Sequence, residues 1–347
     1  MSSPYISKSF YEMQAANRRK TALLLGAFLA LFAVLGYGFD WYFGTGPRGA
    51  AYPWPVFSLV GLVFGGLSAL WSYYNGDRQV LSATGARPAN PAVLEEKQLL
   101  NVVEEMCVAS GLSMIPVYVV PDPDPNAFAV GRDPGHASIA VTQGLLQTLN
   151  REELQGVIGH ELSHVRNLDI RTMTVVAALY GGIVLLSDMA SRSMRWGGFG
   201  GGRGGRGGGG GRDRDGGGAG ILFLVLWILL ILLAPLIGQM MAMAVSRSRE
   251  FDADATSAEM TRNPLGLANA LRKIDGATEP TRSIGRGAAH LCIADPLGRA
   301  VNQSESRWSG LWGTHPPIKK RISLLESMAG VVTSSDVEAQ AAGAATA

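Results

Sequence analysis

Four apolar stretches set the pattern of this chain. Thr21 to Phe39 and Trp54 to Tyr74 contain no charged residue. Residues 219–245 form a third long stretch, and residues 172–188 form a shorter one. A transmembrane helix needs about 20 apolar residues. The three long stretches are therefore predicted to span a membrane, whereas 172–188 either spans, dips into the bilayer or packs against 219–245.

The residues that flank the first two stretches predict their orientation. Aromatic side chains, which favour the membrane–water interface, gather at their ends: Trp41, Tyr42, Trp54, Trp71, Tyr73 and Tyr74. Basic residues, which are retained in the cytoplasm, precede the first stretch: Lys8, Arg18, Arg19 and Lys20. We therefore expect a multi-pass protein of the bacterial plasma (inner) membrane, with residues 1–20 and 75–170 on the cytoplasmic side. If residues 172–188 and 219–245 both span, the arginines of residues 189–218 would lie outside the cytoplasm. This placement conflicts with the preference of basic residues for the cytoplasmic side.

Residues 75–170 have the hydrophobic spacing of helices and strands in a folded domain. An apolar helical face ends at Gly111, a residue that commonly closes helices; it comprises Leu99, Val102, Val103 and Met106. Three predicted strands follow, the last two joined by a turn at Pro134-Gly135: Val117 to Val120, Ala127 to Val130 and Ala137 to Thr142. Residues 246–328 are expected to complete the same domain.

Two segments lack the composition of a packed core. Sixteen of the 24 residues from Gly197 to Gly220 are glycine, which predicts a flexible Gly/Arg-rich loop over 189–218. The Ala-rich segment 329–347 is expected to be disordered. The loop has Arg-Gly pairs but no aromatic residue besides Phe199, and the net charge of the chain is only +2. We therefore expect no nucleic-acid partner.

Composition agrees with a membrane protein. Hydrophobic residues make up 47% of the chain and charged residues only 17%, below the quarter that is typical of soluble proteins. The two cysteines, Cys107 and Cys292, are far apart and lack metal-ligand spacing. They indicate ordinary core packing in a reducing compartment, or a chain indifferent to disulfides.

One pentapeptide, H-E-x-x-H at His160 to His164, carries candidate chemistry. By chance it is expected in about one chain in a hundred of this length. Asn150 and Glu153 have the spacing of a capping box, and apolar residues then recur at helical spacing, which places the motif on a helix. On a helix, residues four apart share a face, so both histidines can bind one metal ion while Glu161 acts as a base.

A catalytic zinc site needs a third protein ligand. The other histidines are His136, His290 and His315, but Glu250 is the better candidate. Glu250 follows the apolar stretch 219–245, and His164 precedes the apolar stretch 172–188. If these two stretches form a membrane hairpin, Glu250 and His164 return to the same side of the membrane. Asp254 lies one turn later, where it can orient a ligating histidine. Alternatively, both acids simply begin a charged helix outside the membrane.

Several segments resemble the HtpX-type membrane zinc metalloproteases of family M48. They lie in the same order and spacing from about Phe10 to Leu325: Phe10 to Thr21, Asn126-Ala-Phe-Ala129, His160 to His164, Arg249 to Asp254, and Thr314-His-Pro-Pro317 with Lys320-Arg321. The resemblance implies an α+β fold with a mainly helical gluzincin domain, a small antiparallel sheet and about four membrane helices. It implies Glu250 as the third ligand of one Zn²⁺ per chain. The long Gly/Arg loop departs from the family.

The resemblance also implies an activity. It predicts a cytoplasm-facing endopeptidase, bound in the lipid bilayer, that degrades misfolded or damaged membrane proteins, with other membrane proteases or chaperones as candidate partners. Glu161 would be the general base. His315 either stabilises the oxyanion or, with Pro316-Pro317, begins a helix. Substrate would add to Ala137 to Thr142 as the edge strand, in a cleft that includes Asn126, Ala127, Phe128, Ala137, Ser138, Ile139 and Ala140.

Two other functions fit the sequence less well. An intramembrane protease would need an apolar helix around the motif, but ionisable residues, which are costly at bilayer depth, flank it: Arg151, Glu152, Glu153, Arg166 and Asp169. A non-enzymatic scaffold would use zinc structurally, in a closed site with four protein ligands, often cysteine. Neither cysteine is near the motif in the sequence, which favours an open, catalytic site.

Overall fold

The structure is a computed structural model that describes residues 10–44, 55–179, 247–277, 282–284, 288–294 and 316–330. It divides into two compact units, one of residues 1–21, 73–178 and 242–347 and the other of residues 22–72 and 179–241. The named helices are α1 (Phe10–Gly44), α2 (Val56–Ala83), α3 (Leu94–Ser110), α4 (Gln143–Thr148), α5 (Arg151–Arg166), α8 (Arg247–Thr261), α9 (Pro264–Asp275) and α12 (Ile318–Met328). The Gly/Arg loop, residues 219–245, His315 and residues 331–347 lie outside the described residues.

The second unit holds an antiparallel helix pair formed by parts of α1 and α2. The two helices approach closely at glycines: a Cβ on Gly36 would lie 2.4 Å from the Phe57 carbonyl oxygen, and one on Gly61 would lie 2.7 Å from that of Phe32. Asp40 accepts a hydrogen bond of 2.8 Å from the Phe57 backbone N–H, so it caps the start of α2. Side-chain size and capping together fix this hairpin.

Helix α2 has the properties of a membrane span. Among the described helices it is the one that is long and apolar enough to cross a bilayer. Its large apolar side chains are mostly exposed, Val60 and Trp71 among them, as contact with lipid requires. The stretch Thr21 to Phe39 lies within α1, and the described part of 172–188 is helical with buried side chains through Ala178.

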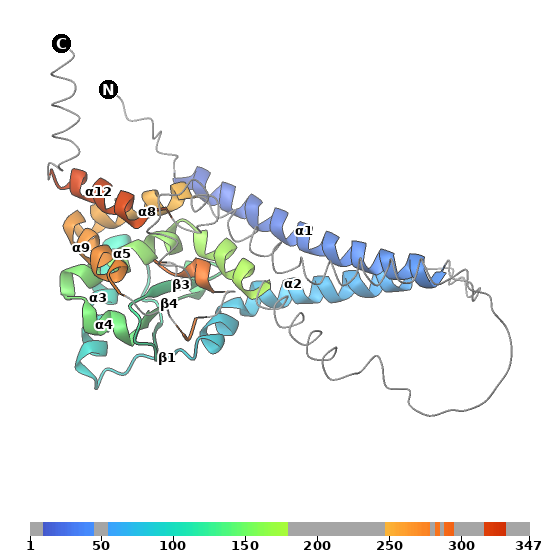
Figure 1. The fold of residues 1–347 in the computed structure, drawn as a ribbon, viewed down its shortest axis with the longest axis horizontal. Helices are drawn as coiled ribbons and strands as arrows, with labels where there is room; N and C mark the ends of the chain where they lie inside the picture. The colour runs from blue at the N-terminus through green and yellow to red at the C-terminus, as the bar shows by residue number, and fades with distance from the viewer. Residues whose placement is uncertain are drawn as a thin grey trace, which may run out of the picture. The chain divides into compact units, whose positions relative to one another are not determined.

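A mixed sheet lies in the first unit (Figure 1). Its order is β1-β2-β4-β3, built from β1 (Arg87–Pro88), β2 (Val117–Val120), β3 (Ala127–Gly131) and β4 (Ala137–Thr142). The predicted strands are confirmed, but the prediction of an antiparallel sheet is wrong. The chain crosses from β2 past β4 to β3 and returns through the turn at 134–136, so β4 runs parallel to β2 and antiparallel to β3.

The metal-motif helix α5 lies at the centre of this unit. The predicted capping box is present, because Asn150 accepts the Glu153 N–H and Glu153 accepts the Asn150 N–H. Helix α5 contacts α3, α8, α9 and β3. Its glycines permit these approaches: a Cβ on Gly156 would meet the backbone nitrogen of Leu267 at 2.7 Å, and one on Gly159 the Ser257 hydroxyl at 2.9 Å. Helices α8 and α9 can therefore pack directly on α5.

The close contact at Gly156 generates a stability prediction. Gly156→Ala should force α5 and α9 apart, and overpacking of this kind costs about 1–3 kcal/mol. We expect a lower midpoint of thermal unfolding for the full chain in detergent. Gln155→Ala, a change at the neighbouring half-buried position, is the control. A Gly156→Ala protein at least as stable as the control would contradict the packing described here.

Candidate metal centre

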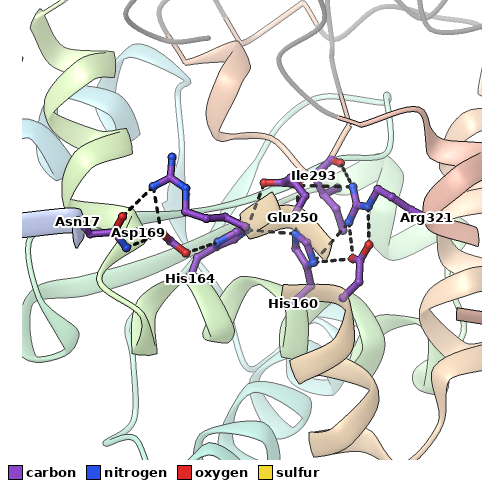
Figure 2. Close-up of polar contacts among 9 residues, drawn as sticks. Asn17, His160, His164, Asp169, Glu250, Ile293 and Arg321 are labelled. Carbon is purple, nitrogen blue, oxygen red and sulfur yellow. Dashed lines mark hydrogen bonds and ion pairs between the residues drawn. The ribbon is translucent and has the colours of Figure 1, made fainter. Parts of the chain in front are cut away.

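Three side chains from two helices converge on one point (Figure 2). His160 and His164 extend from the same face of α5, and their Nε2 atoms lie 3.2 Å apart. From α8, the Glu250 carboxylate lies 3.7 Å from Nε2 of His160 and 3.6 Å from Nε2 of His164. All three side chains are buried. These are the three residues that the sequence predicts as ligands, and the structure brings them together.

The spacing of these atoms suits a metal ion. Ligands that each bind Zn²⁺ at about 2.0–2.1 Å in a tetrahedral arrangement are about 3.3 Å apart. The three ligand atoms here fall close to that separation and lie within 4.8 Å of one another. Two imidazole nitrogens and one carboxylate are also ligands that zinc accepts. The residues present therefore fit a single divalent ion.

Each histidine has a carboxylate next to its Nδ1 atom, on the side away from the metal position. The Nδ1 atom of His160 lies 2.9 Å from Oδ1 of Asp254, so Nδ1–H can donate to the carboxylate while Nε2 faces the metal position. Arg321, which is fully buried on α12, donates two hydrogen bonds to Asp254, of 2.8 and 2.7 Å. Burial alone would raise the pKa of Asp254, but Arg321 holds it below its usual value. Asp254 therefore remains a charged acceptor.

Arg321 also joins other parts of the site. Its Nη1 donates to the Ile293 carbonyl at 2.9 Å and lies 3.6 Å from Oε2 of Glu250. One guanidinium thus connects α12 to a metal ligand, to the carboxylate that orients His160 and to the segment 288–294. The sequence analysis identified Asp254 but did not predict the extent of these Arg321 contacts.

His164 has an equivalent carboxylate that the sequence analysis missed as a partner. Its Nδ1 lies 3.1 Å from Oδ2 of Asp169. The other oxygen of Asp169 accepts hydrogen bonds from Asn17 at 2.7 Å and from Arg249 at 3.0 Å. Burial lowers the pKa of His164, but the hydrogen bond to Asp169 and the charge of Glu250 raise it to about 9. The position of Asp169, five residues after the motif, was the available signal.

Glu161 lies beside the ligands without being one of them. It is buried, and the Ala129 backbone N–H of β3 hydrogen-bonds to its carboxylate. Burial, with a contribution from the nearby Glu250 charge, raises the pKa of Glu161 to about 7. A group with a pKa near neutrality can both accept and release a proton. Glu161 is thus suited to proton transfer at the metal position.

The remaining described histidines and the predicted substrate strand lie elsewhere. His136 is exposed and hydrogen-bonds to Asp133, and His290 is buried against the Met173 carbonyl. Neither is a ligand in the described cluster. The prediction that Ala137 to Thr142 is an edge strand is wrong, because β4 lies between β2 and β3. Its residues Ala137, Ser138, Ile139 and Ala140 therefore have no open edge to offer a peptide.

The other predicted cleft residues lie at the edge of the sheet. Ala127 and Phe128 belong to the edge strand β3, with Asn126 just before it. Cys292 forms an antiparallel bridge with Phe128, and the Ile293 N–H donates to the Ala127 carbonyl at 3.0 Å. Asn126 donates to the Ala294 carbonyl. The outer side of β3 therefore accepts an antiparallel partner, here from the same chain.

Comparisons with known proteins bear on the family of this chain. Residues 93–329 match the family described as Peptidase family M48. A Protease HtpX homolog of Thermoanaerobacter pseudethanolicus is 44% identical over 92% of this chain and 98% of its own length. One of Lactobacillus helveticus is 40% identical over 92% and 99%. The crystal structure of S. mikatae Ste24p aligns with a TM-score of 0.46 at 16% identity, over 91% of this chain and 67% of that chain. The sequence matches alone carry the family assignment.

Metal removal should lower the stability of the protein. An ion at about 1,000 times its dissociation constant stabilises a folded protein by about 4 kcal/mol, which corresponds to a thermal shift on the order of 10 °C. We expect a chelator to lower the unfolding midpoint of the full chain in detergent and added Zn²⁺ to restore it. Glu250→Ala should reduce this metal-dependent shift strongly. A full shift in Glu250→Ala would exclude Glu250 as a ligand.

Loss of Arg321 should destabilise the protein more than loss of a surface arginine. Arg321→Leu leaves Asp254 buried without its partner, and breaking such a buried pair costs about 3–5 kcal/mol. The matched control is Arg272→Leu, because Arg272 also forms an ion pair with α12, through Glu326, but is 43% exposed. Exposed pairs contribute about 0–1 kcal/mol. Similar unfolding midpoints for the two variants would contradict the role assigned to Arg321.

Proposed function

This chain belongs to peptidase family M48 and is a membrane-associated metalloprotease, and we propose that it is a zinc-dependent endopeptidase that degrades misfolded or damaged membrane proteins. The observation that carries the proposal is the cluster of His160, His164 and Glu250 with Glu161 beside it. Three protein ligands leave a position open for water or substrate, as in catalytic zinc sites. A structural scaffold is not favoured, because the described cluster lacks a fourth protein ligand.

The chain's own residues divide the chemistry among them. When bound, Zn²⁺ supplies Lewis-acid polarisation of the peptide carbonyl and makes water nucleophilic near neutral pH. Glu161 takes the proton of the attacking water and delivers it to the leaving nitrogen. Asp254 and Asp169 keep the two imidazoles in the tautomer that leaves Nε2 free. His315, ahead of α12, is the candidate for a second donor to the oxyanion; opening that helix is its alternative role.

We place the substrate on the outer edge of β3. The isolated antiparallel bridge between Phe128 and Cys292 supports this, because it is a main-chain pairing on that edge. The Ala129 N–H, which points to the same side, reaches Glu161, so a peptide there lies beside the base. Strand addition relies on main-chain hydrogen bonds. Side-chain preference should therefore be loose, as suits unfolded substrates.

The active site is proposed to face the cytoplasm of a multi-pass inner-membrane protein. Arg18 and Arg19 follow Asn17 directly, and Asn17 hydrogen-bonds to Asp169 in the metal centre. The basic residues are expected to keep this end of α1 in the cytoplasm, and the metal centre then lies on the same side. Other membrane proteases or chaperones are candidate partners, and nucleic acid is not.

Replacement of the general base separates metal binding from catalysis. Glu161→Gln should retain one zinc ion per chain, measured by elemental analysis, because Glu161 is not a ligand. Its rate of cleavage of a misfolded membrane protein should fall by about 10²–10⁴-fold. Glu152→Gln, an exposed position on the same helix, is the control and should cleave like the wild type. Equal cleavage rates for Glu161→Gln and the wild type would contradict the proposed mechanism.

A further inference from the structure

The N-terminal end of α1 reaches into the metal centre. Asn17 is only 3% exposed, and its Nδ2 donates to Oδ1 of Asp169 at 2.7 Å and to the Asn167 carbonyl at 3.0 Å. Its Oδ1 accepts a hydrogen bond of 3.1 Å from Arg249. The amide is therefore used on both sides, between the end of α5 and the start of α8 (Figure 2).

These bonds constrain the carboxylate that orients His164. One oxygen of Asp169 faces Nδ1 of His164, and the other is held by Asn17 and Arg249. The carboxylate is planar, so fixing one oxygen also fixes the direction of the other. Without Asn17, this buried carboxylate would lose a donor and Arg249 an acceptor. Arg249 would remain as the partner of that oxygen, but one donor in place of two would hold the carboxylate, so its orientation toward His164 would be less well fixed.

Neighbouring residues of α1 make contacts of their own, apart from Asp169. Gln14 donates to the Arg166 carbonyl at 3.1 Å, and the Thr21 hydroxyl lies 2.8 Å from that of Thr172. Positions 14, 17 and 21 share one face of a helix. This face of α1 lies against residues that follow or end α5, and within it Asn17 is the residue that hydrogen-bonds to Asp169. The apolar stretch 21–39 continues in the same helix.

We propose that Asn17 is a positioning residue for the metal ligand His164, so that the metal centre is complete only when the N-terminal end of α1 is docked. The inference rests on the metal site of the proposed function but not on peptide hydrolysis. Gln14 provides the matched control, because it joins α1 to α5 without touching Asp169.

The test measures metal binding by the full chain in detergent. Asn17→Leu, which has similar volume and no amide, should weaken Zn²⁺ binding about 10–100-fold in competition with a chelator, the range found when partners of a metal ligand are removed. It should also shift the visible absorption bands of the Co²⁺-substituted protein, which report ligand geometry. Gln14→Ala should match the wild type in both. Wild-type affinity and spectrum in Asn17→Leu would overturn the inference.

A second variant separates positioning from a general loss of folding. Asp169→Asn should weaken metal binding to a similar extent, and the Asn17→Leu/Asp169→Asn protein should be little worse than either single variant, because both changes break one chain of contacts. Independent, additive losses, or an equal loss in Gln14→Ala, would assign Asn17 to helix packing and overturn the inference. A wild-type chain that binds no metal would overturn it too. Metal binding with no cleavage would refute the proposed function alone.

Discussion

The buried ion pair between Arg321 and Asp254 joins the metal centre to the rest of the fold. Arg321 is fully buried on α12, Asp254 lies on α8, and the pair orients His160 on α5. Burying two charges is costly, and the cost is offset only when geometry and further hydrogen bonds satisfy both groups. Here the guanidinium is bidentate to Asp254 and also donates to Ile293. The pair can form only when several separate segments are in place, so it links the metal site to the completed fold.

The second histidine repeats this arrangement with different segments. His164 faces Asp169, which is held by Arg249, as His160 faces Asp254, which is held by Arg321. In each case an arginine pairs with a carboxylate and the carboxylate faces Nδ1 of the histidine, which leaves Nε2 directed at the metal position. The two halves differ in one respect, because Asn17 from α1 adds a neutral amide to the second. Helix α1 therefore contacts the partner of one of the two histidine ligands.

The sequence predicts the helices and strands, which depend on interactions between nearby residues. It does not predict contacts between segments that are far apart in the chain. The capping box at Asn150 and the apolar period place His160 and His164 correctly, because both signals act within one helix. The ranges of β2, β3 and β4 were predicted for the same reason. Their order was not, since the parallel pairing of β2 with β4 depends on where the chain crosses. The contact of Asn17 with Asp169 spans 152 positions, and no local pattern indicates it.

The alternation of residue size along β3 explains how the base reaches the strand. Successive side chains of a strand point to opposite faces. Ala127 and Ala129 pack in the same core as Leu162 of α5, whereas Phe128 packs in a separate core with Leu291 and Cys292. Small side chains on the α5 face let the helix approach the strand backbone, and Glu161 can then accept the Ala129 N–H. The large side chain on the other face keeps the strand anchored. Size alternation in Ala-Phe-Ala is therefore a requirement of the site geometry as well as of the core.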